Sequence, residues 1–265
     1  MNRSGLSLVF ALLGGLVLLF IIAPLAGLFI KTTPVEFFET VNDQEVTNSI
    51  VLTLGISFVT TLVFALASVP LAYWLARTTF RGKEIIQSIV DLPVVIPHSA
   101  AGIALLGLVS RDTWLGRAAS SIGLDFVGHP LGIGMAMAFV SVPFLIQSAR
   151  DGFIHVPVRL EMAAMSLGAS PLRTFLTVSL PLASRSIVTG MVMMFSRGLS
   201  EFGAIVIIAY HPMVTPVLIY ERFGAFGLKY SRPVAALFVL VCLVFFVILR
   251  ILANRRTHDP AGKYH

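Results

Sequence analysis

Charged residues are scarce in this chain. Only 12% of its 265 residues are Asp, Glu, Lys or Arg, whereas about a quarter is usual in a soluble domain. Cysteine is scarcer still: Cys242 is the only one, which excludes disulfide bonds within the chain and cysteine-based metal sites. Apolar residues dominate, because 57% of the chain is hydrophobic and the mean hydropathy is +0.91. The composition excludes a soluble globular domain and predicts an integral membrane protein.

The chain also lacks a basic surface and a nucleotide-binding loop. Its net charge is +6 and its pI is near 9.9, but the basic residues are scattered between apolar segments, so we predict no nucleic-acid binding. The Gly-Lys pairs at 82–83 and 262–263 are followed by Glu84 and Tyr264, where a P-loop has Ser or Thr. We therefore expect no bound ATP, no metal and no other cofactor on this chain.

Six segments are long and apolar enough to cross a membrane, which takes roughly 20 residues as a helix. Three of them contain no charge, one has Arg250 close to its end, and two carry charges in their interior. We expect these spans to form an all-α fold. The predicted spans are 6–30, 50–76, 85–109, 131–149, 187–210 and 234–253.

The distribution of Lys and Arg predicts the orientation. With an even number of spans, both termini lie on the same side of the membrane. If that side is the cytoplasm, it holds twelve of the 19 Lys and Arg residues and the outer side six, with Arg197 inside the membrane. The positive-inside rule therefore predicts cytoplasmic N- and C-termini in a multi-pass protein of the cell membrane. No internal repeat is evident, so we expect residues 1–265 to form one membrane domain surrounded by lipid.

A long polar interruption separates the fourth and fifth spans, at residues 150–185. Good helix formers occupy 158–167, Gly168 is a typical helix stop, and Ser170 followed by Pro171 is typical of a helix start. Four apolar residues then recur at helical spacing, and the opposite face offers polar side chains. We predict two short helices and call residues 158–181 the elbow. The apolar face is Leu172, Phe175, Leu176 and Leu180, and the polar face is Arg173, Thr174, Thr177 and Ser184.

The periodicity of the elbow is compatible with two roles. It could lie along the membrane interface as an amphipathic segment. Alternatively, it could project into the cytoplasm and dock on another protein. The pattern by itself does not decide between them.

The third span contains Asp91, Pro93, Pro97 and His98. Each proline frees a carbonyl oxygen that lipid cannot bond, so this part should be kinked and turned toward protein or a water-filled path. Asp91 and His98 are seven residues apart, which on a continuous helix places them on one face about two turns apart. They could line a translocation path, or Asp91 could be interfacial and His98 a packing residue. Their separation is too long for direct proton exchange, so we do not expect an enzyme.

The fifth span carries Arg197, Ser200 and Glu201. Arg197 and Glu201 are four residues apart and can pair on one helical face, which offsets part of a cost of about 2.5 to 3.5 kcal/mol for each charge at the bilayer centre. The pair could hold helices together. It could equally line a path or gate, with Arg197 attracting an anion and Glu201 limiting how tightly that anion is held.

The elbow resembles the cytoplasmic signature loop of the permease subunits of ATP-binding-cassette (ABC) importers. That loop reads Glu-Ala-Ala, then Gly and, after nine residues, Ile-x-Leu-Pro; here Gly168 is followed after nine residues by Val178, Leu180 and Pro181. One departure is that Met162 precedes the alanine pair, with Glu161 one position earlier. The resemblance implies a coupling helix that inserts into a separate ATPase subunit. The residues that it assigns to coupling are Glu161, Ala163, Ala164, Gly168, Ala169, Ser170, Pro171, Leu180 and Pro181.

Three further stretches, at 91–98, 200–204 and 208–223, resemble one branch of that family, the permease subunits of molybdate and tungstate importers, with sulfate importers as their nearest relatives. The resemblance implies a type I ABC importer permease fold and a homodimer of permeases. It also implies two cytoplasmic ATPase subunits that bind ATP and Mg²⁺, and an external oxyanion-binding protein. On this view Tyr210, His211 and Pro212 face the binding protein.

The sequence is also compatible with two other functions. One is a sulfate or thiosulfate permease of the same family, because tetrahedral dianions of similar size would be separated mainly by the delivery protein. The other is a secondary transporter driven by an ion gradient, although the absence of internal symmetry makes that less natural.

Overall fold

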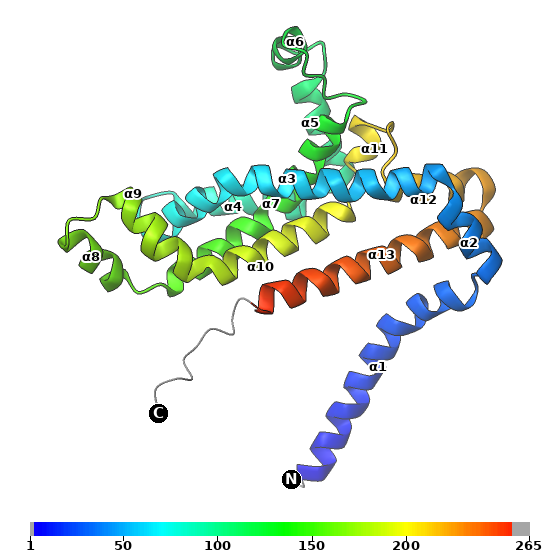
Figure 1. Ribbon diagram of the computed structural model, residues 1–265, viewed down its shortest axis with the longest axis horizontal. Helices are drawn as coiled ribbons and strands as arrows, with labels where there is room; N and C mark the ends of the chain where they lie inside the picture. The colour runs from blue at the N-terminus through cyan, green and yellow to red at the C-terminus, as the bar shows by residue number, and fades with distance from the viewer. Residues whose placement is uncertain (1–2, 256–265) are drawn as a thin grey trace. The chain divides into compact units, whose positions relative to one another are not determined.

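The structure is a computed structural model that describes residues 3–255, and all regular elements in that range are helices (Figure 1). The predicted all-α class is therefore confirmed. The helices before the elbow are α1 (Arg3–Ile30), α2 (Pro34–Asn42), α3 (Gln44–Arg77), α4 (Lys83–Val95), α5 (His98–Val109), α6 (Trp114–Ser121) and α7 (Pro130–His155). From the elbow on they are α8 (Val158–Ser166), α9 (Pro171–Thr174), a π-helix (Phe175–Ser179), α10 (Leu180–Leu199), α11 (Ile205–Ile208), α12 (Thr215–Phe226) and α13 (Leu228–Arg255).

The chain divides into two compact units. Unit 1 consists of the residues up to Asn48 together with Leu218–Val241, and unit 2 consists of Ser49–Val217 together with the residues from Cys242 onward. In unit 1, Thr33 caps α2 through a reciprocal pair of hydrogen bonds with Glu36. Arg222 binds Asp43 at 2.7 Å and Glu45 at 2.8 Å, which ties α12 to the residues that begin α3. Burial raises the pKa of the Asp43 carboxyl, but the hydrogen bond and charge of Arg222, together with backbone N–H donors of Glu45 and Val46, outweigh burial and lower that pKa.

The core of unit 2 is built around α7 and α10. These helices approach closely because Gly190 has no side chain: a Cβ atom there would lie 2.9 Å from the Cβ atom of Ser148. The Ser148 hydroxyl donates a 2.7 Å hydrogen bond to the carbonyl oxygen of Ser186 across the same contact. Small residues and short hydroxyl side chains are typical of helix contacts in membranes, where tight packing replaces the hydrophobic effect. This packing supports the elbow at one end of α10.

Within residues 3–255, five helices are long and apolar enough to cross a membrane: Ser7–Ile30, Gln44–Arg77, Pro130–His155, Pro171–Leu199 and Leu228–Leu249. A sixth span results if α4 and α5 are counted together, although these two helices meet at an angle of 112°. The break lies at Ile96, which is extended (φ −71°, ψ 148°) because it precedes Pro97. Pro93, by contrast, lies within α4 without ending it. Of the two prolines, only Pro97 marks the break.

The break also corrects one expectation. Asp91 belongs to α4 and His98 begins α5, so the two side chains do not share a helical face as a continuous span would require. The fifth predicted span, 187–210, differs too, because α10 ends at Leu199 and α11 begins only at Ile205. The Glu201 side chain accepts a 2.8 Å hydrogen bond from the backbone N–H of Ala204, which stabilises the start of a new turn.

The second half of the elbow also runs differently from the prediction. It is not a separate short helix, because α9, the π-helix and α10 form one continuous helical segment, Pro171–Leu199. Pro181 has no N–H to donate to the carbonyl of Thr177, so the helix widens locally. In this wider turn the N–H of Leu180 donates to the carbonyl oxygen of Phe175, five residues earlier, whereas an α-helix would use the residue four positions earlier.

The contact between α5 and α11 yields a stability prediction. A Cβ atom on Gly102 would lie 2.9 Å from Cα of Ala204 and 3.0 Å from its carbonyl oxygen, and backbone atoms cannot easily move away. We expect Gly102→Ala to lower the free energy of unfolding in detergent by about 1 to 3 kcal/mol. The matched control is Gly107→Ala in the same helix, where no atom lies within 4 Å of the new methyl group. That change should stabilise by about 0.5 to 1 kcal/mol. Equal effects of the two changes would show that α5 does not pack on α11.

Candidate functional site

The first helix of the elbow and the turn that follows it have the local structure that the sequence predicts (Figure 1). Helix α8 ends at Ser166, and Gly168 adopts the left-handed conformation with φ +89°. The Ser170 hydroxyl then accepts a hydrogen bond of 3.3 Å from the N–H of Arg173, with Pro171 in the first turn of α9. Two strong local signals thus determine where the chain reverses direction between α7 and α10.

A buried carboxylate attaches the elbow to α3. Glu161 accepts hydrogen bonds from Nη2 of Arg77 at 2.7 Å and from the Ser179 hydroxyl at 2.6 Å. Arg77 Nε lies 3.0 and 2.9 Å from the two carboxylate oxygens, so the contact is bidentate. Arg77 also donates a 3.0 Å hydrogen bond to the carbonyl of Val156, at the end of α7. Glu161 therefore points into the protein and positions the elbow, while its neighbours in the signature pattern face outward.

Sequence reasoning missed the partners of Glu161. Arg77, Tyr73 and Ser179 are 84, 88 and 18 residues away from it along the chain. Tyr73 adds two aromatic contacts, with ring centroids 5.2 Å from Phe153 and 4.9 Å from Phe175. Because Phe153 belongs to α7 and Phe175 follows α9, the Tyr73 ring packs α3 against the helix before the elbow and against the second half of the elbow. In the sequence, Arg77 is one of several basic residues that follow a predicted span, and nothing marks it as the partner of Glu161.

Glu161 is ionised despite its burial. Burial raises its pKa, but the hydrogen bonds from Arg77 and Ser179 and the charge of Arg77 outweigh it, so the net pKa lies below the usual value of 4.5. A buried pair whose hydrogen bonds are nearly all satisfied is costly to break from one side. While Glu161 is ionised, its bonds to Arg77 and Ser179 hold the elbow against the ends of α3 and α10.

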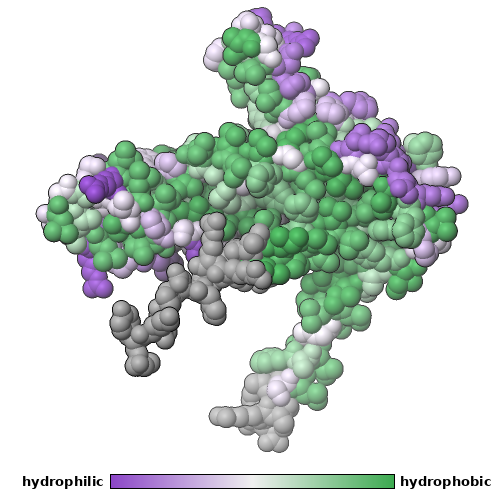
Figure 2. All heavy atoms as spheres, viewed as in Figure 1, coloured by the Kyte–Doolittle hydropathy of each residue, from purple (hydrophilic) through white to green (hydrophobic). Residues whose placement is uncertain are grey.

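The outer surface of the elbow exposes large apolar side chains among polar ones. Leu167 is 90% exposed, Leu172 67% and Met162 57%, and Figure 2 shows hydrophobic and hydrophilic residues mixed over this end of unit 2. Ala163, Gly168, Ser170, Pro171 and Pro181 are also exposed, whereas Ala164, Ala169 and Leu180 are partly buried. The predicted faces need one correction. Thr174, expected on the polar face, is 2% exposed, and Phe175 packs into the core with Leu180.

A second group of predicted residues meets at the junction of α5, α10 and the turn before α11. Glu201 Oε2 lies 3.1 Å from Arg197 Nη2 and 3.0 Å from His98 Nδ1. Arg197 Nη2 is in turn 2.8 Å from His98 Nε2, and its Nη1 donates a 3.2 Å hydrogen bond to the Ser200 hydroxyl. These contacts are satisfied by the imidazole tautomer that carries its hydrogen on Nδ1. We call His98, Arg197, Ser200 and Glu201 the central cluster.

The central cluster is sealed on one side and accessible on the other. The Glu201 side chain is 1% exposed, that of Arg197 23% and that of His98 40%. Gly203 allows His98 to approach, because a Cβ atom there would lie 2.7 Å from Cβ of His98. An anion that entered from the accessible side would meet Arg197 and the imidazole before the buried carboxylate. The arrangement can therefore attract an anion while Glu201 competes with it for Arg197.

Asp91 and Pro93 are not part of this cluster. Asp91 accepts a 2.6 Å hydrogen bond from the side-chain amide of Gln147 on α7, a partner that the sequence did not indicate. Pro97 lies at the break and begins the turn that presents His98. Tyr210, His211 and Pro212 follow α11; His211 and Pro212 are exposed, and the Tyr210 and His211 rings are 5.1 Å apart. In residues 3–255, no group of three or more His, Cys, Asp or Glu residues is arranged to hold a metal ion.

These features are those of a membrane-embedded transport subunit. Residues 68–258 match the family described as binding-protein-dependent transport system inner membrane component, and the chain belongs to that family. It is 44% identical over 256 residues to the molybdate/tungstate transport system permease protein WtpB of Pyrococcus furiosus, a match that covers 96% of this chain and 98% of that protein. Identity to the sulfate transport system permease protein CysT of Synechocystis sp. is lower, 31% over 245 residues, covering 89% and 85% of the two chains.

A solved structure shares the fold. The chain superposes on a bacterial alginate ABC transporter, solved in complex with its alginate pentasaccharide-bound periplasmic protein, with a TM-score of 0.73 at 21% identity over 96% of each chain. The type I ABC importer permease fold implied by the elbow is therefore confirmed.

The attachment of the elbow gives a prediction with a pH dependence. Because the pKa of Glu161 is lower in the folded than in the unfolded chain, its stabilising contribution is complete above about pH 4.5 and disappears as the pH falls through the lower folded value. We expect Glu161→Gln to lower the free energy of unfolding by about 3 kcal/mol at pH 7, because Arg77 then keeps a partly buried charge without its partner. The difference between the two proteins should shrink in acid.

Asp125→Asn is the control for the Glu161 experiment. The pair of Asp125 and Arg111 also has a short contact, 3.0 Å, but both side chains are exposed, so stability should change little. Thermal melts in detergent between pH 3 and 7 would measure both variants. A Glu161→Gln protein as stable as the parent at pH 7 would contradict the anchoring role.

The central cluster gives a second prediction. Glu201→Ala leaves the Arg197 charge partly buried without a carboxylate, so it should destabilise the protein by about 3 kcal/mol. The double change Arg197→Gln and Glu201→Gln removes both charges and should cost less than the single change. Thermal denaturation in detergent gives the comparison. If both proteins melt close to the parent, the pair is solvated and its charges do not interact strongly.

Proposed function

We propose that this chain is the membrane-spanning permease subunit of an ATP-driven importer that carries molybdate or tungstate. The observation that carries the transport class is the elbow, a rigid apolar projection held by Glu161 and Arg77 at the end of a bundle that has no nucleotide-binding loop of its own. The choice of cargo rests on the name of the relative that is 44% identical over nearly its whole length. Sulfate, the cargo named for the relative at 31% identity, is the second candidate.

The elbow is the docking site for an ATPase subunit in this proposal. Exposed leucine and methionine side chains on a projecting surface gain free energy when a partner covers them. The Glu161 anchor transmits movement, because a displaced α8 pulls on α3 through Arg77 and on the start of α10 through Ser179. ATP and Mg²⁺ belong to the partner, and two ATPase subunits serve two permease chains.

In this proposal, the orientation in the membrane comes from the distribution of Lys and Arg, and the homodimer and the external partner come from the family. The elbow and both termini lie in the cytoplasm, because that orientation places the larger share of Lys and Arg there. Two copies of the chain form a homodimer in the cell membrane. Tyr210, His211 and Pro212 face outward, where an oxyanion-binding protein delivers the cargo, and the exposed rings of this loop provide contact area.

The central cluster lies on the translocation path in this proposal. Arg197 is the one cationic group of the cluster that reaches the accessible side. Its guanidinium can donate several hydrogen bonds to a tetrahedral dianion. Glu201 keeps the site from binding too tightly, because the anion must compete with a carboxylate 3.1 Å from the same nitrogen. A path that admits an oxyanion can therefore also release it.

Transport in proteoliposomes tests the proposed function. The chain is reconstituted with an ABC ATPase and an oxyanion-binding protein from the same organism, and uptake of radiolabelled molybdate is measured with ATP inside the vesicles. We expect uptake that requires ATP, is competed by tungstate, and is not competed by a tenfold excess of sulfate. Uptake driven by an ion gradient without ATP would replace the proposal with a secondary transporter. Equal competition by sulfate would move the chain to the sulfate branch.

Gly168 provides a variant that separates coupling from folding. Its φ of +89° is strained for any other residue, and no atom lies within 4 Å of a Cβ atom placed there, so Gly168→Val costs about 1 to 2 kcal/mol of local strain without a clash. We expect the variant to insert normally while ATP hydrolysis and uptake become uncoupled. Gly123→Val, with φ +78° and equally open surroundings in another loop, is the matched control and should transport normally. Normal uptake by the Gly168 variant would count against the docking role.

A further inference from the structure

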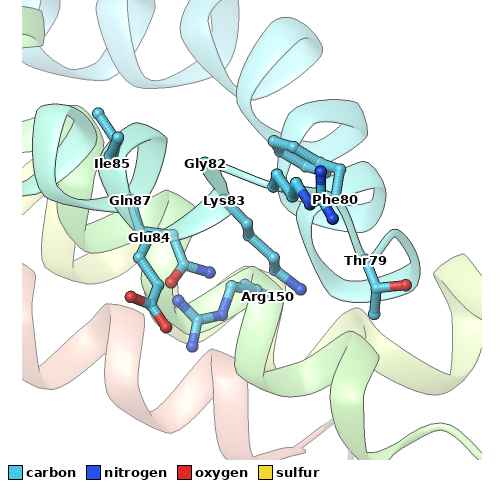
Figure 3. Close-up of a pocket in the computed structure, with 9 residues that line it drawn as sticks. Thr79, Phe80, Gly82, Lys83, Glu84, Ile85, Gln87 and Arg150 are labelled. Atoms are coloured by element: carbon cyan, nitrogen blue, oxygen red, sulfur yellow. The ribbon is translucent and has the colours of Figure 1, made fainter.

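A pocket of about 710 Å³ opens where α3 ends and α4 begins. It is lined by the loop Thr79–Gly82, by the first turns of α4 and by Arg150 of α7. Figure 3 shows Lys83 and Arg150 extending from their two helices into the same space, with the Glu84 carboxylate beside Arg150. None of these residues belongs to the central cluster or to the elbow, so the proposed transport mechanism does not account for the pocket.

The pocket carries positive charge. Arg81, Lys83 and Arg150 line it, and Glu84 is the one acidic residue among the lining residues, which leaves a net charge of +2. In the described chain, the one ion pair of Arg150 is a long contact of 4.0 Å with the exposed carboxylate of Asp151, and Lys83 Nζ donates to the carbonyl oxygen of Thr78 at 2.9 Å. The Arg150 guanidinium and the other hydrogens of Lys83 stay available for an anion.

The start of α4 adds backbone donors to the same pocket. Gly82 is the N-cap residue, with φ +92°, and no side chain caps the 13-residue helix. The N–H of Lys83 already donates to the carbonyl oxygen of Phe80 at 3.3 Å, but the N–H groups of Glu84 and Ile85 have no carbonyl partner inside the helix and favour an anion in front of them. Three cationic side chains and an uncapped helix start thus surround one space, which matches an anionic group with several acceptor oxygens, such as a phosphate.

The position of the pocket favours a lipid over a soluble anion. Its residues connect Arg77, the last residue of one membrane-spanning helix, to Lys83, the first residue of the next helix. Next to the charges lies an apolar surface: the rings of Trp74 and Phe80 are 4.8 Å apart, and Ile85 and Ile89 are 65% and 62% exposed. Aromatic residues collect at the level of lipid head groups. A ligand that is anionic at one end and apolar at the other fits both surfaces.

We propose that this pocket binds the phosphate head group of an anionic phospholipid, with the acyl chains along Trp74, Phe80 and Ile85. Basic pockets between membrane helices commonly hold such head groups. Arg150 couples the site to α7, the helix that leads into the elbow, so a bound lipid would also join α4 to α7. The proposal depends on the membrane location of the chain and is independent of the transported oxyanion.

Fluorescence quenching tests the site directly, because the chain has only two tryptophans and Trp74 contacts the pocket wall. Trp114→Phe, at an exposed position on α6, leaves Trp74 as the single reporter. The protein is placed in phosphatidylcholine vesicles that contain increasing fractions of phosphatidylglycerol with brominated acyl chains. A basic residue near the membrane surface is worth about 1 kcal/mol, or about five-fold in affinity. The net charge of +2 therefore predicts a preference for phosphatidylglycerol of roughly 25-fold.

Three variants define the expected outcome. Arg81→Gln combined with Lys83→Gln should reduce the preference to about one, whereas Arg81→Lys combined with Lys83→Arg keeps the charge and should keep the preference. Arg150→Gln alone should lower it about five-fold. Arg185→Gln removes an exposed charge of the same sign from α10, outside the pocket, and should leave the preference unchanged.

The same measurement can overturn the proposal. A preference that survives the double glutamine change, or that falls equally with Arg185→Gln, would show attraction to the whole surface instead of a site. If 10 mM inorganic phosphate abolishes the preference while chloride of equal ionic strength does not, the pocket is a site for a soluble anion. Molybdate uptake does not enter the readout, so failure of the lipid site and failure of the proposed transport function remain distinguishable.

Discussion

The Glu161 carboxylate joins three parts of the chain that lie far apart in the sequence. It accepts hydrogen bonds from Arg77 at the end of α3 and from Ser179 near the start of α10, while Arg77 also reaches the end of α7. A charge in such a place is tolerated only when its partners are complete, and here Arg77 provides a bidentate contact. With α8 attached in this way, its leucine and methionine side chains stay at the surface, among them Met162, which is 57% exposed. The elbow is thus attached directly to the end of α3 and to the start of α10.

The central cluster depends on a different constraint. Where a span is broken, backbone N–H and C=O groups lose their hydrogen-bond partners inside the helix. Pro97 ends α4, and His98 begins α5 at an angle of 112° to it. Lipid cannot satisfy the polar groups exposed at such a break, so the break must face protein or water. Here it brings His98 within 3.0 Å of Glu201, beyond the end of α10. Two interrupted helices thus place a cation, an imidazole and a carboxylate side by side within a largely apolar unit.

The family match and the structure support the same class of protein, but only the names of the relatives bear on its cargo. Membership in the binding-protein-dependent transport family rests on a match over residues 68–258 and agrees with the elbow and the absence of a nucleotide-binding loop. The identity of the anion does not follow from geometry, since an arginine and an imidazole would accept any tetrahedral dianion. The names of the relatives separate molybdate and tungstate from sulfate, with 44% against 31% identity. The basic pocket beside α4 follows from neither source, because its charges come from a loop, from α4 and from α7 and are ordinary one by one.

The sequence by itself determined the membrane class, the helical content and, in the elbow, where α8 ends and where the next helix starts. These features depend on local chemistry: long uncharged runs, a glycine with positive φ and a serine before a proline each act within a few residues. Tertiary structure alone decided which polar residues meet. Asp91 and His98 were expected on one face but are separated by the break at Pro97, and Asp91 binds Gln147 instead. Glu161 binds Arg77 across 84 positions, and Arg197 meets His98 across 99. Such contacts depend on how whole helices pack and bend, which no local pattern encodes.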